Sequence, residues 1–264
     1  PARFDERGLP RPRPAFEGLF GDNHLPESGQ SPWQVRRHGD SMAVFASPSV
    51  LSYGTGKNRV EEEKLRSSLA QLLEDMGLEQ AASVRASGSQ VLPGEWVTYQ
   101  YGQGTVGIFL RDPTSKPRVR LDVHFKDPGF VYDALKGKLV SRGRKARTAM
   151  SGEPLAAITR LPYHVNEIVA DMPEQVLPGK RLEVRVRVIA DEALPGDHVV
   201  QVSLLSPGGR LLRHYTKYFP CPNGAGETYL HLAENETPGL YTLRVRDALT
   251  GLTQVRSVTL LPPA

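Results

Sequence analysis

MAVFASPSVLSYGTGKNRVEEEKLRSSLAQLLEDMG, residues 42–77, contains the one long helix that the sequence predicts. The apolar run 42–46 predicts a strand, and a Gly- and Ser-rich loop follows it. Asn58 suits the N-cap of the helix, and Gly77 supplies its stop. A lone strand and helix cannot bury an apolar face between them. We therefore expect the helix to pack on a sheet formed elsewhere, in this chain or in another.

The helix carries a single apolar stripe. From Leu65 onward its apolar residues recur at i, i+4, i+7, i+8 and i+11, which is a helical period. Three glutamates, 61–63, lie in the first turn, where the helix dipole favours negative charge. The stripe consists of Val60, Leu65, Leu69, Leu72, Leu73 and Met76. We interpret Leu65, Leu69 and Leu72 as candidates for docking on a partner.

The composition indicates a soluble, β-rich protein of several domains. A length of 264 residues suits two or three domains. With 39% hydrophobic and 23% charged residues, the chain has enough apolar surface to fold. No apolar run approaches the roughly 20 residues that span a bilayer, so no transmembrane segment is expected. The 22 prolines and 25 glycines favour short strands joined by turns.

Two further features limit the possible chemistry and the expected location. The single cysteine, Cys221, excludes an internal disulfide and a Cys-based zinc site, and a Pro-flanked loop predicts an inert thiol. The chain begins with Pro1, so we interpret it as processed or excised, with a targeting segment lost. We expect a periplasmic or extracellular location, with a cytoplasmic one as the alternative.

Residues 1–41 predict an extended, Pro-rich arm. Pro10, Pro12 and Pro14 each remove a backbone donor and bias the preceding residue toward extended geometry. Apolar side chains at the end of this run are costly to leave in water. We therefore expect the arm to dock on this chain or a neighbour through Phe16, Leu19 and Phe20.

The strand–helix unit, residues 42–82, is followed by a β-domain over 83–163. Within 118–125, apolar and polar residues alternate with period two, which predicts a strand with one dry and one wet face. Gln103-Gly104 and 133–137 predict tight hairpins. The candidate strands are 95–101, 105–111, 118–125, 129–133, 138–142 and 154–161.

Residues 164–264 predict an immunoglobulin-like β-sandwich, separated from the β-domain at Pro162. Turn signals such as Pro178-Gly179 and Asn223-Gly224 recur every 8–12 residues or so, which is typical of this fold. The antibody-type Cys…Trp…Cys pattern is absent. The expected strands are 165–170, 181–189, 198–205, 210–218, 227–233, 240–246 and 253–260. The fold class expected for the whole chain is mainly β, with one short α/β strand–helix unit.

No catalytic signature stands out, and two polar groupings remain candidates. Asp122 and His124 share one strand face and could orient a proton transfer or bind a metal. Without a third ligand or a nucleophile, an exposed polar face is the simpler interpretation. Six basic residues between 136 and 147 form the one dense basic patch, which we interpret as a solvated hairpin without aromatic neighbours. We expect no metal, no cofactor and no nucleic-acid partner.

Aromatic residues offer another route to function. Trp96, Tyr99 and Tyr101 lie on one predicted strand, with Tyr99 and Tyr101 on the same face and Trp96 on the other. Exposed, such rings could stack on a sugar; buried, they would be ordinary cross-strand packing.

Several phrases together resemble bacterial β-galactosidase-like glycoside hydrolases. DERGLPRPRPAFEGLFG (5–21) is similar to the run that enters the trimerisation domain of those enzymes, and residues 39–79 look like the last strand and helix of that domain. GIFLRDP (107–113) and FVYDALKGKLVSRG (130–143) resemble the β-domain that follows. The resemblance covers residues 3–163. It implies a C-terminal, non-catalytic region, because the (β/α)₈ barrel with its two catalytic glutamates needs about 250 residues and is absent here.

Two functional hypotheses follow. The first is a non-catalytic structural or interaction protein, whose β-rich modules dock on protein subunits in a homo- or hetero-oligomer. The second is an accessory or carbohydrate-binding region of a secreted glycoside hydrolase. An exposed aromatic face around 96–101 would favour the second, and a protein-covered helix stripe would favour the first.

Overall fold

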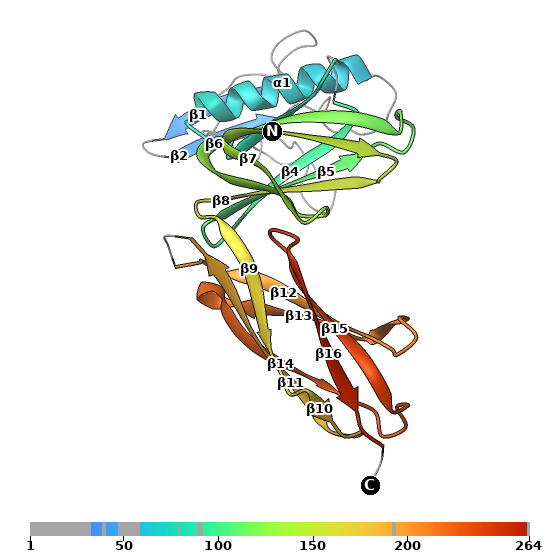
Figure 1. The fold of residues 1–264 in the computed structure, drawn as a ribbon. Coiled ribbons are helices and arrows are strands. Elements are labelled where there is room, and N and C mark those ends of the chain that lie inside the picture. Colours follow the sequence, from blue (N-terminus) through green and yellow to red (C-terminus); the bar gives the residue numbers. More distant parts are fainter. Residues whose placement is uncertain are drawn as a thin grey trace, which may run out of the picture. The chain divides into compact units, whose positions relative to one another are not determined.

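A computed structural model describes residues 33–38, 41–46, 59–78, 80–88, 92–191 and 194–262. The chain divides into two compact units, Pro1–Glu79 and Gln80–Ala264. Figure 1 colours the elements along the sequence. No helix within the described ranges is long and apolar enough to cross a membrane.

The first unit is a β-hairpin with one helix. The predicted strand is β2 (Ser41–Ala46), and it pairs in antiparallel fashion with β1 (Trp33–His38). The sequence prediction missed β1, because it treated everything before residue 42 as an extended arm. Trp33 of β1 donates from its indole nitrogen to the Ser68 hydroxyl of the helix at 2.8 Å. The hairpin thus supplies part of the sheet that the helix needs.

Helix α1 (Arg59–Asp75) begins directly after Asn58, the predicted N-cap, which itself lies outside the described residues. It ends as predicted at Gly77, whose φ of 75° suits glycine. The Gly77 N–H donates to the carbonyl of Glu74 and the Leu78 N–H to that of Leu73, both at 2.8 Å. This pair of bonds is a Schellman motif, which satisfies carbonyls that the helix leaves open.

The second unit starts with a six-stranded sheet. Its strands are β3 (Ala82–Ala86), β4 (Gly94–Tyr101), β5 (Gly104–Arg111), β6 (Arg118–Asp133), β7 (Lys138–Ser151) and β8 (Leu155–Leu161). Their order is β3-β6-β8-β5-β4, and β7 pairs with β6. The sheet curls into a half-barrel, and the Trp96 indole of β4 donates to the Ala82 carbonyl of β3 at 3.3 Å. The concave side is filled by side chains such as Phe109, Leu121 and Phe125.

Most predicted strands of this sheet are confirmed, with three differences. The predicted strands 118–125 and 129–133 are halves of one long strand, β6, whose pairing is irregular between His124 and Gly129. The first hairpin turns at 102–103, one residue earlier than predicted. The sequence prediction missed β3 and the second half of β7. Their buried positions hold small or weakly apolar residues, such as Ala82, Ala146 and Thr148, so their alternation gives little hydrophobic signal.

The rest of the second unit is the predicted sandwich of two sheets, drawn from yellow to red in Figure 1. One sheet has the order β14-β11-β9, and the other has the order β10-β16-β15-β12-β13. The strands are β9 (Val165–Asp171), β10 (Gln175–Val176), β11 (Arg181–Ala190), β12 (His198–Leu205), β13 (Leu211–Cys221), β14 (Ala225–His231), β15 (Gly239–Asp247) and β16 (Thr253–Leu260). All seven predicted strands are confirmed, and only the two-residue β10 was missed.

Packing within the sandwich supports its immunoglobulin-like character. Alternate residues of β11, including Leu182, Val184 and Val186, face alternate residues of β12 and β15 in one buried cluster. The Tyr241 hydroxyl donates to the Thr237 carbonyl at 2.8 Å, back across the turn that precedes β15. A tyrosine bonded in this way near the start of the penultimate strand is the tyrosine corner of such sandwiches.

A buried hydrogen-bond chain lies where the half-barrel meets the sandwich. Tyr163, in the short connection between β8 and β9, places its hydroxyl 3.0 Å from His198 Nε2. His198 Nδ1 lies 3.0 Å from Asp247 Oδ1, and both of these side chains are 0% exposed. A carboxylate can only accept, so Nδ1 carries the proton. The Tyr163 hydroxyl accepts from the Gly196 N–H at 2.8 Å and can donate to Nε2.

The same junction brings two turns into direct contact. Arg246 of β15 donates to the carbonyls of Ala134 and Leu135, in the β6–β7 turn, at 2.7 and 2.9 Å. Gly251, in the β15–β16 turn, lies so close that a Cβ on it would sit 2.1 Å from the Ala134 oxygen. Glycine is therefore required here for space as well as for backbone conformation.

We expect Gly251→Ala to destabilise the protein more than Gly209→Ala does. Both glycines have positive φ, 73° and 76°, but a Cβ on Gly209 meets nothing within 4 Å. Gly209→Ala should therefore cost only the backbone strain, about 1–2 kcal/mol. Gly251→Ala adds a backbone clash and should cost about 1–3 kcal/mol more. Urea unfolding of both variants measures the difference, and equal losses would contradict the tight junction.

Candidate functional site

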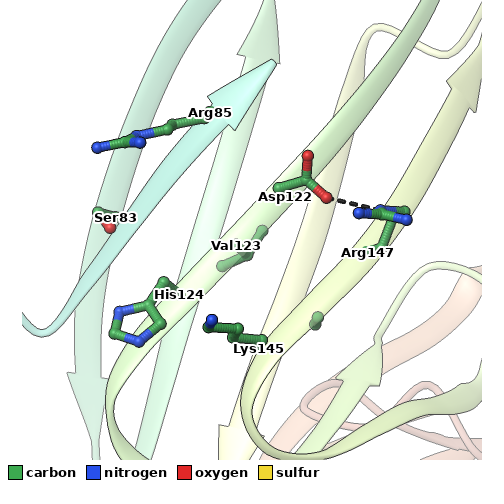
Figure 2. A pocket seen from close by; sticks show the side chains of 8 residues that line it. Ser83, Arg85, Asp122, Val123, His124, Lys145 and Arg147 are labelled. Carbon is green, nitrogen blue, oxygen red and sulfur yellow. Dashed lines mark hydrogen bonds and ion pairs between the residues drawn. The ribbon is translucent and has the colours of Figure 1, made fainter. Parts of the chain in front are cut away.

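An open pocket of about 670 Å³ lies on the outer, polar face of the half-barrel, over β3, β6 and β7. Figure 2 shows the side chains that line it. Its floor includes Val123 of β6 and Ala146 of β7. Its polar side chains are Ser83, Arg85, Asp122, His124, Lys145 and Arg147.

Strand register places these polar side chains in two rows. Residues directly opposite each other in antiparallel strands share a face. In one row, His124 lies between Ser83 on β3 and Lys145 on β7. In the other row, two residues along the strand, Asp122 lies between an arginine of β3 and an arginine of β7, Arg85 and Arg147. We call this face, with its two rows, the basic face.

The one carboxylate on the basic face is already engaged. Arg147 Nε lies 2.6 Å from Asp122 Oδ1, and the Ser87 hydroxyl donates to the other carboxylate oxygen. The Ser87 hydrogen bond, followed by the Arg147 hydrogen bond, holds the pKa of Asp122 below its ordinary value. Asp122 therefore stays ionised and paired at neutral pH.

The other basic side chains of this face have no such partner. Within the described part of the chain, no hydrogen bond or ion pair engages the side chains of Arg85, His124 or Lys145. All three are exposed, and Figure 2 shows the His124 ring and the Lys145 amine pointing into the same space. Like charges gathered without a partner repel one another, so the site is suited to an anion.

Sequence reasoning identified part of this site. The pattern of β6 placed Asp122 and His124 on one wet face, and the structure confirms that placement. It also singled out Lys145 and Arg147 as part of a basic patch but treated them as a solvated hairpin. It missed Ser83 and Arg85, because they lie on β3, the strand whose small buried residues hid its alternation. Among the described residues, no cluster of three or more side chains could hold a metal ion.

Asp133, at the start of the predicted hairpin 133–137, is only 2% exposed. Its Oδ2 accepts from the Thr148 hydroxyl at 2.9 Å and lies 3.2 Å from the Lys136 amine. Because Asp133 is buried and bound to both of these partners, we assign it a structural role in the hairpin.

The three aromatic candidates of β4 do not form one platform. Trp96 packs against the core of the half-barrel, directly over Gly107, where a Cβ would clash with its ring. Tyr101 packs against the cluster at the sandwich junction. Tyr99 alone remains 55% exposed. Two of the three rings thus do core packing, and one is available to a ligand or a partner.

The candidates for partner docking fall in different places. Phe16, Leu19 and Phe20 lie outside the described residues. On α1, Leu72 is buried, Leu65 is half-buried and Leu69 is 40% exposed. The single chain therefore buries only part of the predicted stripe.

Sequence reasoning missed an exposed apolar surface on the half-barrel. We call it the outer apolar patch, and it is formed by Val97, Tyr99, Ile108, Leu110 and Leu155. Val97 and Leu110 are 37% and 46% exposed. On β5 and β8, the apolar residues of the patch alternate with buried apolar residues. Both faces of these strands are therefore apolar, and the alternation of polar and apolar residues that marks a solvent-exposed face is missing.

Comparison with known proteins gives partial structural similarity only. No protein-family model and no curated protein matches the chain. The β-glucosidase from Listeria innocua in complex with isofagomine aligns at a TM-score of 0.29 and 17% identity, over 39% of this chain and 17% of that chain. The superoxide reductase (neelaredoxin) from Ignicoccus hospitalis aligns at 0.27 and 14%, over 37% and 82% of the two chains. The putative β-galactosidase from Bacteroides fragilis aligns at 0.25 and 12%, over 60% and 32%.

The similarity to glycoside hydrolases is thus of low TM-score and covers part of each chain. This chain spans 17% of the β-glucosidase and 32% of the putative β-galactosidase. Likeness at this level carries no argument about activity.

Cys221 is the remaining reactive group, and the structure places it in the sandwich core at 0% exposure. Burial, with a smaller effect of the Asp247 charge, raises the pKa of its thiol to about 12. The sequence prediction of an inert thiol agrees with this environment.

We expect Cys221 to react with an aromatic disulfide reagent at pH 8 at least about 100-fold more slowly in the native protein than in the urea-unfolded chain. The reason is that the thiolate is the reacting species, and burial suppresses both its formation and its access. Absorbance of the released thiolate gives both rates, with glutathione as the control for urea itself. Comparable native and unfolded rates would contradict the buried placement.

Proposed function

We propose that this chain is a non-catalytic interaction protein whose β-rich modules assemble with protein subunits, first of all with a second copy of the chain. The observation that supports this proposal is the outer apolar patch. Exposed apolar side chains scattered singly are ordinary, but several on adjacent strands are characteristic of an interaction surface.

The register of the sheet gathers the patch on one face. Val97 of β4 lies opposite Ile108 of β5, and Leu110 of β5 lies opposite Leu155 of β8. Their neighbours along the strands point the other way, as Phe109 does at 0% exposure. The patch therefore extends over three adjacent strands, and exposed Glu95 of β4 lies opposite Leu110 at its edge.

The same face is covered by protein at one end. Tyr101 and Val106, further along β4 and β5, pack against the buried cluster that joins the half-barrel to the sandwich. The outer apolar patch continues this covered surface beyond the sandwich. Its composition suits a second protein surface, since interface cores are apolar and rich in tyrosine.

We expect the protein to self-associate reversibly and Leu110→Glu to weaken that association at least about tenfold, because a carboxylate would then be buried in the interface. The matched control is Leu194→Glu, the same change at a loop leucine that is 86% exposed. Sedimentation over a range of concentrations gives the dissociation constants, and thermal unfolding verifies that both variants fold. A protein that stays monomeric at its highest soluble concentration, or equal effects of the two variants, would refute the proposal.

A different observation favours a second candidate function. The exposed Tyr99 ring offers one flat apolar surface, of the kind on which a sugar can stack. The resemblance of residues 3–163 to the C-terminal region of β-galactosidase-like enzymes also favours a carbohydrate-associated role. Under this candidate, the chain is an accessory or carbohydrate-binding region of a glycoside hydrolase that works outside the cytoplasm.

Under both candidates, we expect the purified chain to hydrolyse no aryl galactoside or aryl glucoside. A glycosidase needs two carboxyl groups about the scissile bond, one of them with a raised pKa. Asp122 instead has a lowered pKa and is paired with Arg147, and Asp133 is bound to Thr148 and Lys136. Release of aryl alcohol is the readout. Turnover that Asp122→Asn or Asp133→Asn abolishes would show that the chain is an enzyme.

A further inference from the structure

We propose that the basic face over β3, β6 and β7 binds an anionic polysaccharide, with one sulfate or carboxylate group held between Arg85, His124 and Lys145. This site lies on the opposite face of the sheet from the side chains that enter the core, such as Leu121 and Phe125. It uses none of the residues of the outer apolar patch.

The charges on this face are unbalanced. Besides the pocket residues, Arg118 and Arg120 lie on the same face of β6, because they alternate with the buried Val119 and Leu121. Asp122 is the only carboxylate among these outward positions of β6, and Arg147 already neutralises it. The face as a whole therefore retains a positive potential that an anion would relieve.

Geometry favours a linear ligand over a small one. Outward residues of a strand repeat about every 6.6–6.8 Å, and neighbouring strands lie about 4.8 Å apart. The arginines of β6 extend the pocket along the strand, so successive charges of a polymer can meet successive cations. Each exposed ion pair contributes little by itself, so useful affinity needs several contacts at once.

The chemistry of the pocket argues against nucleic acid. The eight side chains that line it include no Phe, Tyr or Trp, and the imidazole of His124 is their one aromatic ring. Single-stranded nucleic acids are held largely by stacking of successive bases on several aromatic rings, and one imidazole provides little of that contact. Sugar rings that carry sulfate or carboxylate groups need no such contact, because their charges alone can be recognised by the cations and by the Ser83 hydroxyl.

An anionic membrane is also a poorer match. Membrane-surface sites combine basic residues with apolar side chains that enter the lipid. Among the described residues, β3, β6 and β7 carry no large exposed apolar side chain. The nearest one along the chain is Leu135, in the turn that joins β6 to β7. The basic face thus offers charge without an apolar anchor.

The test is binding of the full chain to dextran sulfate, polygalacturonate and uncharged dextran, measured by titration calorimetry at low salt. We expect binding to at least one of the two polyanions, weakened by added salt, and none to uncharged dextran. The two polyanions distinguish sulfate from carboxylate as the recognised group. Absence of binding to both would overturn the proposal.

The variant is the double charge reversal Arg85→Glu with Lys145→Glu. Its matched control is Lys180→Glu with Arg187→Glu, which changes the net charge equally at exposed positions of the sandwich. We expect the pocket variant to lose about tenfold or more in affinity and the control less than about threefold. Equal losses would mean that net charge alone attracts the polymer, and would overturn the assigned site.

Two further arms keep the outcome decisive. If the reversed pocket variant fails to unfold cooperatively on heating, the neutral pair Arg85→Gln with Lys145→Gln replaces it, with an expected loss of about three- to tenfold. Oligothymidine and phosphatidylserine vesicles are titrated in parallel. If one of these two probes binds more tightly than both polysaccharides, and the pocket variant loses that binding, the face binds nucleic acid or membrane. That result would refute the polysaccharide proposal.

Discussion

A histidine with no access to water connects the two folds of the second unit. His198 is held by Asp247 on one ring nitrogen and by the Tyr163 hydroxyl on the other, so all three side chains must be in place together. Asp247 also accepts from the N–H and the hydroxyl of Thr250, at 2.9 and 2.6 Å, which leaves no oxygen of this buried carboxylate unsatisfied. Loss of any one member would strand a buried polar group, and such groups are costly. Because Tyr163 belongs to the connection and the other two to the sandwich, the chain fixes how β8 leads into β9.

With that junction fixed, the half-barrel has three surfaces of different character. Its concave side is an apolar core, its outer side over β3, β6 and β7 is basic, and its outer side over β4, β5 and β8 is apolar. Each surface follows from the period-two alternation of the strands that build it. A single curled sheet can therefore present a charged and an apolar surface at once, without an additional domain.

The two outer surfaces lead to complementary roles. An apolar patch that continues a protein-covered face suits assembly with protein, as proposed above. Unpaired cations around an open pocket suit a ligand that brings its own negative charges. Neither role requires a general acid, and Asp122 and Asp133 are both bound to other side chains.

The sequence by itself determined the strand periods, the helix and its stop, and most turns. Strong alternation, as in 118–125 and 181–189, identified strands directly, and Gly77 marked the end of α1 because few other residues adopt its conformation. Pro162 lies between β8 and β9, where strand pairing changes from one set of sheets to the next. The sequence also predicted an inert Cys221 thiol, but from a loop position, whereas the structure buries this residue at the end of β13.

Only the tertiary structure decided which residues form the sites. The pocket joins Arg85 to His124 and Lys145 from three strands, and the strand that carries Arg85 has only small residues on its buried side. The junction joins Tyr163, His198 and Asp247 across up to 84 positions of sequence, and nothing local marks any of them. The periodicity of a strand shows which residues share a face, but the pairing of strands decides which faces meet. That pairing depends on long-range packing, which local patterns do not encode.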